Sequence, residues 1–222
     1  MTGGDAVVFD LGGVLIEWDP RHLCRRLLPD HEVELFLTTV CTPAWNAEQD
    51  AGRSFREGVD ALVARFPEHA GIVRAYWERW AEMLGDPVAG AEELVADVIA
   101  ADARCFALTN WSAETFPIAR TRFPWLARFE GIVVSGEEGV IKPDARLYRT
   151  LLERHSLRAD RCLFVDHMPA NVSAASALGF HAIEFGGIDD LRRRFVRLGV
   201  LQTSWTPARL SSPSVDREAG LP

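Results

Sequence analysis

Hydrophobic and polar positions follow two patterns along the 222-residue chain. Short apolar runs, typical of buried parallel strands, occur at residues 6–9, 104–108, 131–134, 161–165 and 181–185. Between and after these runs, apolar positions recur at helical spacing over residues 91–101, 145–155, 172–178 and 188–198. Strands that alternate with helices in this way predict an α/β fold built on a doubly wound parallel sheet.

A long helical stretch separates the first of these strands from the second. Its apolar positions predict helices over residues 21–28, 32–40, 54–66 and 72–84. Ser54 and Glu57 have the spacing of a capping box, which marks the start of a helix. The sequence Gly85-Asp86-Pro87 then predicts a break after the last helix.

This helical stretch predicts a two-part organisation. A direct connection between two strands does not need several helices, so we expect residues 17–87 to form an inserted, all-helical domain. Residues 1–16 and 88–202 then form the α/β core. The Ser, Pro and charged residues from 203 to 222 show no period, which predicts a disordered tail.

The first strand ends in a single carboxylate, Asp10, and the glycines at positions 12 and 13 let the backbone turn sharply after it. A carboxylate at the carboxyl end of a parallel strand lies where open α/β sheets usually hold their active sites. Asp10 is therefore a candidate nucleophile. Taken alone, the same pattern also suits an aspartate that caps a turn.

Further polar groups follow later strands of the predicted sheet: Thr109-Asn110, Lys142 and Asp166. Because the carboxyl ends of parallel strands meet at one edge, we expect these groups to lie near Asp10. Lys142 is the only lysine among 24 basic residues, which favours a site that needs a compact point charge. Its ammonium can hold two carboxylates and an anionic group together, while Thr109 and Asn110 can orient substrate oxygens. Asp10 and Asp166 offer the oxygen ligands that Mg²⁺ prefers.

Each of these groups, taken separately, also suits a structural role. Thr109 can be the neighbour of a helix cap, Lys142 a surface lysine and Asp166 a turn residue. Their combination in this order is what favours a catalytic site.

The composition of the chain argues against several classes of function. The chain is 48% hydrophobic and 25% charged, as expected of a globular protein with a sizeable core. A net charge of -8 argues against nonspecific binding to nucleic acid or to an anionic membrane. No apolar run is long enough to cross a bilayer, and the N-terminus lacks a secretory signal pattern, so we expect a cytoplasmic protein.

The polar groups fall within four motifs that resemble those of the haloacid dehalogenase (HAD) superfamily of hydrolases. They are Phe9-Asp10-Leu11-Gly12-Gly13-Val14, Leu108-Thr109-Asn110, Lys142-Pro143, and Val165-Asp166 followed by Pro169 and Asn171. The resemblance extends to about residue 201 and includes a helical cap inserted after the first motif, as in subfamily I. It implies a Rossmann-like core with this cap.

The resemblance also implies roles for individual residues. Asp10 would be the covalent nucleophile, and Thr109 and Asn110 would bind the transferred group. Lys142 would neutralise charge. Mg²⁺ would be bound by the carboxylates of Asp10 and Asp166 and by the backbone carbonyl of residue 12. The implied partner is a small phosphorylated metabolite, bound by a monomer or a homodimer.

Two positions depart from the usual phosphatases of this superfamily. Most of these have a second aspartate two residues after the nucleophile, as general acid and base, where this chain has Gly12. Sugar-phosphate phosphatases are among the relatives that have glycine there. Positioned proton transfer typically contributes ~10²- to 10⁴-fold in rate, so we expect a bias toward good leaving groups such as sugar-1-phosphates, acyl phosphates or aryl phosphates.

The second departure is His167, where relatives commonly have another acidic residue. Replacing a carboxylate by imidazole removes negative charge and favours Mn²⁺ or Co²⁺ over Mg²⁺. A histidine that merely caps the following helix explains the same residue equally well.

The helical insertion offers candidates for substrate binding. They lie near the hinge or between the second and third predicted helices, in a segment that we expect to be irregular: Trp18, Trp45, Asn46, Gln49, Asp50 and Arg53. Such a segment can cover the crevice and select the substrate. We expect Trp18 and Trp45 to contact substrate and Arg53 to pair with a phosphate or carboxylate. The tryptophans also suit the core of the helical domain, and the arginine also suits solvent.

Three functional hypotheses follow. The first is a metal-dependent hydrolase that cleaves the phosphomonoester of a small metabolite through an aspartyl-phosphate on Asp10. The second is a 2-haloacid dehalogenase, in which the same aspartate displaces halide without a metal. The third is a catalytically weakened protein that keeps the fold for binding or regulation, as Gly12 and His167 would allow.

Overall fold

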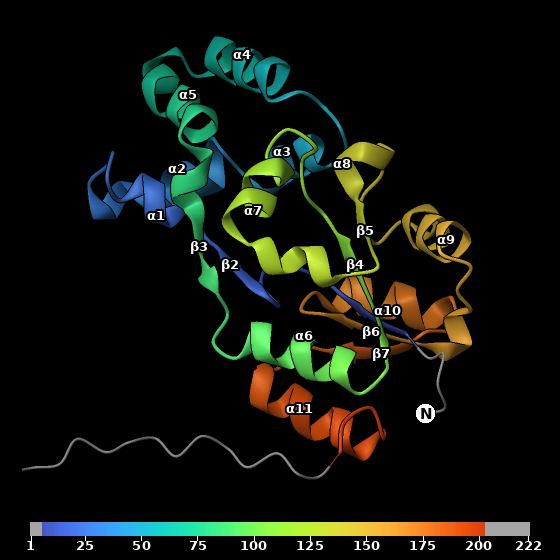
Figure 1. Cartoon of the computed structure of the whole chain (residues 1–222). Coiled ribbons are helices and arrows are strands. Elements are labelled where there is room, and N and C mark those ends of the chain that lie inside the picture. The colour runs from blue at the N-terminus through green and yellow to red at the C-terminus, as the bar shows by residue number, and fades with distance from the viewer. Residues whose placement is uncertain (1–5, 203–222) are drawn as a thin grey trace, which may run out of the picture.

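A central parallel sheet organises the computed structural model, which describes residues 6–202 (Figure 1). Its strands have the order β5-β4-β1-β6-β7. They are β1 (Ala6–Phe9), β4 (Arg104–Thr109), β5 (Gly131–Val134), β6 (Cys162–Asp166) and β7 (His181–Glu184). The predicted disordered tail at residues 203–222 lies outside the described residues.

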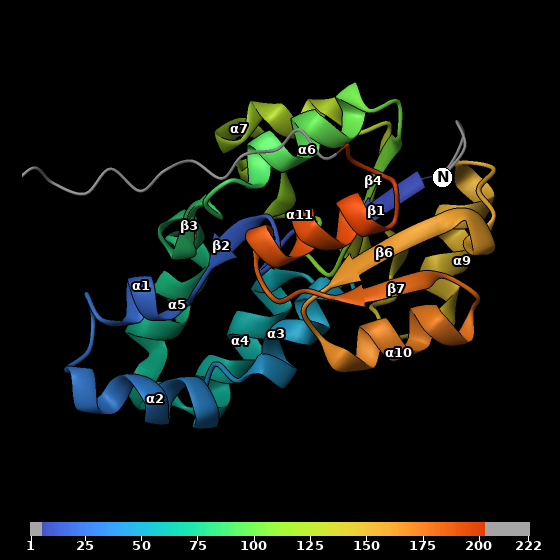
Figure 2. The ribbon, with the colours of Figure 1, turned by 90° about the horizontal axis from the view of Figure 1, so that it is seen from below.

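Helices cover both faces of this sheet (Figure 2). They are α6 (Ala91–Ala100), α7 (Phe116–Arg122), α8 (Ser135–Glu138), α9 (Ala145–Arg154), α10 (Pro169–Ala177) and α11 (Ile188–Arg197). Short 3₁₀ turns at Pro124–Arg128 and Ala159–Arg161 complete the core. Within residues 6–202, no helix has the length and apolar character needed to cross a membrane.

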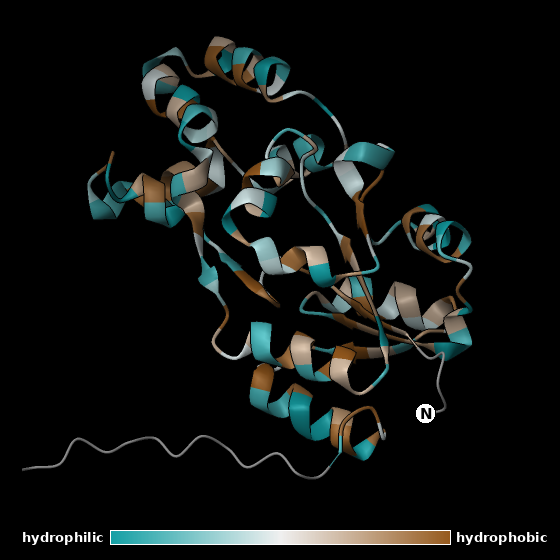
Figure 3. Ribbon diagram, in the orientation of Figure 1, coloured by the Kyte–Doolittle hydropathy of each residue, from teal (hydrophilic) through white to brown (hydrophobic). Residues whose placement is uncertain are grey.

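The side chains of β1 alternate between two hydrophobic layers, because successive residues of a strand point to opposite faces. Val7 and Phe9 pack in one layer with α6 and α11, whereas Ala6 and Val8 pack in the other with α9 and α10. The strands β1, β4, β5 and β6 are accordingly mainly hydrophobic in Figure 3. These two layers confirm the predicted doubly wound α/β fold.

The order of the strands sets the position of the active-site candidates. From β1 the sheet grows through β4 and β5 on one side and through β6 and β7 on the other. The junction between β1 and β6 is therefore the topological switch point, where open α/β sheets bind their ligands. Phe9 is paired with Val165, so Asp10 and Asp166 follow side by side. Two carboxylates thus meet at the switch point.

A helical segment lies beyond the carboxyl ends of these strands (Figures 1 and 2). It contains α1 (Arg21–Cys24), α2 (Asp30–Thr39), α3 (Pro43–Asp50), α4 (Phe55–Arg65) and α5 (Ala70–Glu78), with 3₁₀ turns at Pro67–His69 and Trp80–Met83. The chain enters and leaves it through two antiparallel strands, β2 (Ile16–Trp18) and β3 (Leu84–Pro87). The predicted N-cap of α4 is present, because the Ser54 hydroxyl accepts a hydrogen bond from the Glu57 N–H. The Glu57 carboxylate accepts from the Ser54 hydroxyl, not from the Ser54 backbone N–H of a complete capping box.

Several segments differ from the sequence-based expectations. The segment expected to be irregular contains α3, because Thr42 caps it by accepting from the Trp45 N–H and Pro43 suits the first helical position. Residues 85–87, expected to break a helix, belong to β3 and pair with β2. The helix expected over residues 72–84 ends at Glu78. Residues 25–28 do not continue α1.

Ser135 joins the helical segment to the sheet. This buried residue follows β5, and its hydroxyl donates a hydrogen bond of 2.5 Å to the Asp50 carbonyl at the end of α3. The same oxygen accepts from the Trp111 N–H at 2.9 Å. Nearby, the Glu114 carboxylate accepts from the Phe55 N–H at the start of α4. These bonds hold the end of α3 against the carboxyl edge of the sheet.

We expect Ser135→Ala to lower the free energy of unfolding by ~1–3 kcal/mol, because it leaves the Asp50 carbonyl and the Trp111 N–H buried without a partner. Urea denaturation measures the change. Ser176→Ala is the matched control, since Ser176 is exposed on α10, and it should alter stability by less than about 0.5 kcal/mol. Equal effects of the two substitutions would contradict the joining role of Ser135.

Candidate active site

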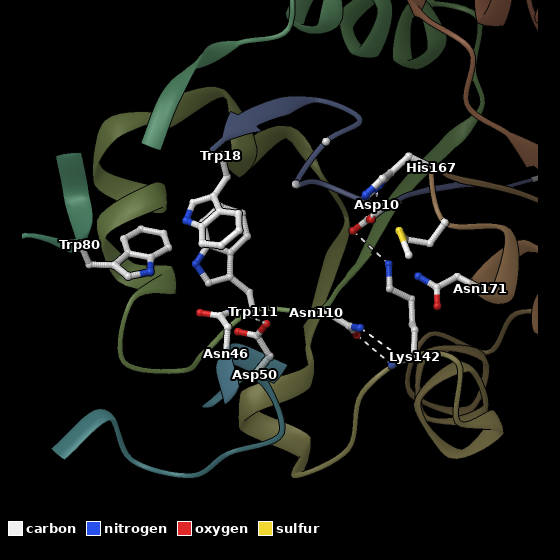
Figure 4. Close-up of a pocket in the computed structure, with 13 residues that line it drawn as sticks. Asp10, Trp18, Asn46, Asp50, Trp80, Asn110, Trp111, Lys142, His167 and Asn171 are labelled. Atoms are coloured by element: carbon white, nitrogen blue, oxygen red, sulfur yellow. Dashed lines mark hydrogen bonds and ion pairs between the residues drawn. The ribbon is translucent and has the colours of Figure 1, made fainter. Parts of the chain in front are cut away.

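A pocket of about 230 Å³ opens at the switch point, between the sheet and the helical segment (Figure 4). Its polar wall comes from the core and contains Asp10, Asn110, Lys142, His167 and Asn171. Its aromatic wall contains Trp18, Trp80 and Trp111, and α3 contributes Asn46 and Asp50. Gly12, Gly13 and Met168 complete the lining.

Lys142 lies at the centre of the polar wall. Its fully buried ammonium forms ion pairs with Asp10 Oδ1 at 2.9 Å and with Asp166 Oδ2 at 2.7 Å. It also donates a hydrogen bond of 2.8 Å to the Leu108 carbonyl. An ammonium has three N–H bonds, so these contacts use all of them. The lysine therefore fixes both carboxylates in place at the ends of neighbouring strands.

The two carboxylates differ in how many hydrogen bonds their oxygens accept. Asp166 is fully buried, accepts from the Met168 N–H at 2.8 Å, and has the Asn171 amide nitrogen 3.1 Å from each oxygen. Asp10 accepts from the Leu11 N–H through Oδ1 at 2.8 Å, while its Oδ2 lies 3.4 Å from His167 Nδ1. Oδ1 of Asp10 is thus held by Leu11 and Lys142, whereas Oδ2 contacts His167, and the residue lines the pocket, as a nucleophile requires.

The charges around this pair shift its pKa values. Burial would raise the pKa of Asp10, but the charge of Lys142 and the contacts of both Lys142 and His167 lower it below the ordinary range. Burial and the charge of Asp10 raise the pKa of Asp166. The hydrogen bond to Asp10 raises the pKa of His167. The site therefore favours an ionised Asp10.

The two residues that end β4 have different surroundings. Asn110 lines the pocket, but its side chain is paired with the Lys142 backbone: Nδ2 donates to the carbonyl at 3.0 Å and Oδ1 accepts from the N–H at 2.8 Å. These bonds use one N–H of the amide, so the role of the second N–H in orienting substrate stays a prediction. Thr109 is fully buried outside the pocket lining, and its hydroxyl has no hydrogen-bond partner within residues 6–202.

Of the six candidates in the helical insertion, Trp18, Asn46 and Asp50 line the pocket. Trp45 is buried in the helical segment, where its indole N–H donates to the Gly58 carbonyl at 3.1 Å. Arg53 forms an ion pair with Glu48 and is absent from the lining. The structure therefore does not bring Trp45 and Arg53 to the candidate site.

The helical geometry of α3 explains this correction. Residues four apart share one face of a helix, so Asn46 and Asp50 lie together on the pocket side while Trp45 and Gln49 lie together on the buried side. Thr42 and Pro43 form a helix-start signal, and this signal predicts which residues of α3 share a face. Trp80 and Trp111 were not singled out from the sequence, although Trp111 directly follows the second motif.

Asp50 is the one ionisable residue of the helical segment that lines the pocket. Asn46 Nδ2 donates a hydrogen bond of 3.0 Å to its Oδ2. Burial raises its pKa to about 7 and the charge of Asp10 adds to this effect, although hydrogen bonds from Ser112 and Asn46 oppose it. A carboxyl group with this pKa exchanges its proton near neutral pH.

The four motifs and this geometry agree with a comparison to known families. A model of the haloacid dehalogenase-like hydrolases matches residues 5–179. The chain belongs to this family. Among curated proteins, a sesquiterpene phosphatase of Aspergillus oryzae is 26% identical over 188 residues, which span 78% of this chain and 86% of that protein.

Solved structures show the same fold. A HAD-family enzyme of Bacteroides thetaiotaomicron has a TM-score of 0.70 at 18% identity, over 87% of this chain and 99% of that one. The same Bacteroides enzyme has been crystallised with magnesium and inorganic phosphate. An L-2-haloacid dehalogenase of Xanthobacter autotrophicus has a TM-score of 0.59 at 20% identity, over 87% of this chain and 82% of that one.

The raised pKa of Asp50 makes the stability of this HAD-like hydrolase depend on pH. The carboxyl has an ordinary pKa of 3.8 when unfolded and about 7 when folded, so the folded protein binds more protons between these values. Stability from this group is therefore lost as the pH rises through that window. We expect Asp50→Asn to raise the free energy of unfolding at pH 8 by on the order of 2 kcal/mol, allowing for partial exposure, and to change it little at pH 4.

Urea denaturation at both pH values measures this effect. Asp60→Asn is the matched control, because Asp60 is exposed on α4, and it should change stability little at either pH. If Asp50→Asn were equally or less stable than wild type at pH 8, the Asp50 carboxyl would not carry the pKa shift.

Proposed function

We propose that this HAD-like hydrolase is a metal-dependent phosphatase that transfers the phosphoryl group of a small metabolite to Asp10. The observation that carries this proposal is the fully buried Lys142 ammonium between Asp10 and Asp166. It keeps two carboxylates side by side below an open pocket. Such a site suits a substrate with several anionic oxygens and a cation that bridges them to the carboxylates.

The side chains present suit a divalent cation. Ligand atoms of Asp10, Asp166 and His167 lie within 4.8 Å of one another, and the Gly12 carbonyl is the further ligand implied by the family resemblance. A cation held there would neutralise charge on the phosphoryl oxygens. The magnesium complex of the Bacteroides enzyme supports Mg²⁺, while the imidazole of His167 makes Mn²⁺ or Co²⁺ alternatives.

In the proposed reaction, a carboxylate oxygen of Asp10 attacks phosphorus and the bond from phosphorus to the substrate oxygen breaks. Water then attacks the phosphorus of the aspartyl-phosphate, the bond to Asp10 breaks, and inorganic phosphate leaves. The Leu11 N–H and Lys142 hold Oδ1 of Asp10, so the nucleophile keeps one orientation in both steps.

The pocket supports a small substrate with an apolar or planar part. The indole rings of Trp18, Trp80 and Trp111 form the wall opposite Asp10, Lys142 and His167. The substrate would place its phosphoryl group against Lys142 and the remainder against these rings. The sesquiterpene phosphatase relative supports an organic phosphomonoester as the substrate class.

A dehalogenase is the second candidate, because the Xanthobacter enzyme shares the fold. There the same aspartate would displace halide from carbon, and neither Asp166 nor His167 would need to bind a cation. The buried pair of carboxylates beside Lys142 favours the phosphatase.

Assays over a panel of phosphorylated metabolites with Mg²⁺, with Mn²⁺ and with EDTA test the proposal. We expect turnover with a divalent cation and loss of turnover in EDTA. Asp10→Asn should abolish it, whereas Asp60→Asn should leave it unchanged. Hydrolysis of 2-chloropropionate that persists in EDTA would establish the dehalogenase instead. Failure to turn over either substrate class would favour a binding or regulatory protein.

A further inference from the structure

Gly12 leaves an open space beside the nucleophile. A Cβ atom placed at this position would meet no neighbouring heavy atom within 4 Å. Its φ lies outside the left-handed region, so a larger residue would not be strained there. The core thus has room for a proton donor at position 12 but provides no side chain. The reaction proposed above nevertheless needs a proton for the departing substrate oxygen.

Four ionisable groups line the pocket: Asp10, Asp50, Lys142 and His167. Three of them already have a role in the proposed reaction. Asp10 is the proposed nucleophile, and Lys142 uses its three N–H bonds on Asp10, Asp166 and Leu108. His167 lies against Asp10, within the proposed set of cation ligands. Asp50 is the remaining group.

Asp50 also has a suitable position. Figure 4 shows it beside Asn46 on the α3 side of the pocket, across from Lys142 and His167. In an in-line displacement the leaving oxygen points away from the attacking oxygen, toward the side of the pocket opposite the nucleophile. A carboxyl group on that side is placed to meet the leaving oxygen.

The structure holds this carboxyl group firmly. Asn46 donates to Oδ2, and Ser135 donates to the backbone carbonyl of the same residue. The other ionisable groups that line the pocket are Asp10, Lys142 and His167, and burial together with the charge of Asp10 favours the protonated form of Asp50. At neutral pH it is present both as an acid and as a base.

We propose that Asp50 is the general acid and general base of this site, supplied by the helical segment in place of a side chain at position 12. This inference rests on the proposed phosphatase function. In the first step the Asp50 carboxyl gives its proton to the substrate oxygen as the bond to phosphorus breaks. The leaving group departs as an alcohol, and Asp50 becomes a carboxylate.

In the second step the Asp50 carboxylate takes a proton from the attacking water. The bond from phosphorus to Asp10 breaks, phosphate leaves, and Asp50 is protonated again, so protons balance over the cycle. The bias toward good leaving groups expected from Gly12 therefore does not apply to the intact enzyme. We expect this bias toward good leaving groups in an enzyme that lacks the Asp50 carboxyl group.

The experiment compares Asp50→Asn with wild type on glycerol phosphate and on 4-nitrophenyl phosphate. We expect the variant to lose ~10²- to 10⁴-fold in kcat on glycerol phosphate, because an alkoxide needs a proton to leave. Nitrophenolate leaves without one, so the first turnover of 4-nitrophenyl phosphate should keep nearly its wild-type rate. Slow hydrolysis of the aspartyl-phosphate should follow, which gives a burst of one nitrophenolate per enzyme.

Two further variants separate a catalytic from a structural role. Asp60→Asn makes the same chemical change at an exposed position of α4 and should leave both rates unchanged. Gly12→Asp, added to Asp50→Asn, should restore part of the glycerol phosphate activity, because a side chain at position 12 has open space. A purely structural defect at α3 would not be rescued in this way.

The outcomes distinguish the role of Asp50 from the proposed phosphatase function on which it rests. Wild-type rates of Asp50→Asn on glycerol phosphate would overturn the role of Asp50 while leaving the phosphatase intact. Loss of the burst together with glycerol phosphate activity, without rescue by Gly12→Asp, would overturn it as well. Absence of Asp10-dependent hydrolysis of both substrates by the wild-type enzyme would instead overturn the proposed function itself.

Discussion

The candidate site depends on one buried ammonium between two carboxylates. Asp10 and Asp166 end neighbouring strands, and burying both beside each other costs free energy unless a cation compensates. Lys142 supplies that charge, and Asn110 holds the Lys142 backbone through two hydrogen bonds. The loop after β5 therefore fixes the charge balance of the whole site. Any anionic substrate or divalent cation must fit around this arrangement.

The helical segment supplies active-site groups that the core lacks. The core contributes charged groups at the switch point, but it has no side chain at position 12. The helical segment and its entry strand β2 add Asp50, Trp18 and Trp80 to the pocket, and Ser135 fixes the end of α3 to the sheet. Proton transfer and substrate contact therefore depend on the contact between the two parts of the chain.

Strand positions were the most predictable part of the protein. Apolar runs located the parallel strands, and residues at their carboxyl ends had to meet, so Asp10, Lys142 and Asp166 were found together as expected. The helical segment was less predictable. Its short α3 has few apolar residues and was expected to be irregular. Because a helix turns by about 100° per residue, only Asn46 of the neighbouring candidates Trp45 and Asn46 lines the pocket, and the sequence analysis did not separate the two.

The short strands β2 and β3 were missed for a different reason. Their pairing is a tertiary contact, and Gly85, Asp86 and Pro87 have low intrinsic preference for strands. Trp80 and Trp111 contribute to the pocket only because distant segments meet there. Local patterns do not contain that information.

Mass spectrometry of enzyme quenched in acid during turnover detects the aspartyl-phosphate itself. We expect one phosphoryl group on the peptide that contains Asp10, present with substrate and divalent cation and absent without substrate. Steady turnover with the phosphoryl group on another residue, or with unmodified Asp10 under conditions where its phosphate survives, would contradict the proposed role of Asp10.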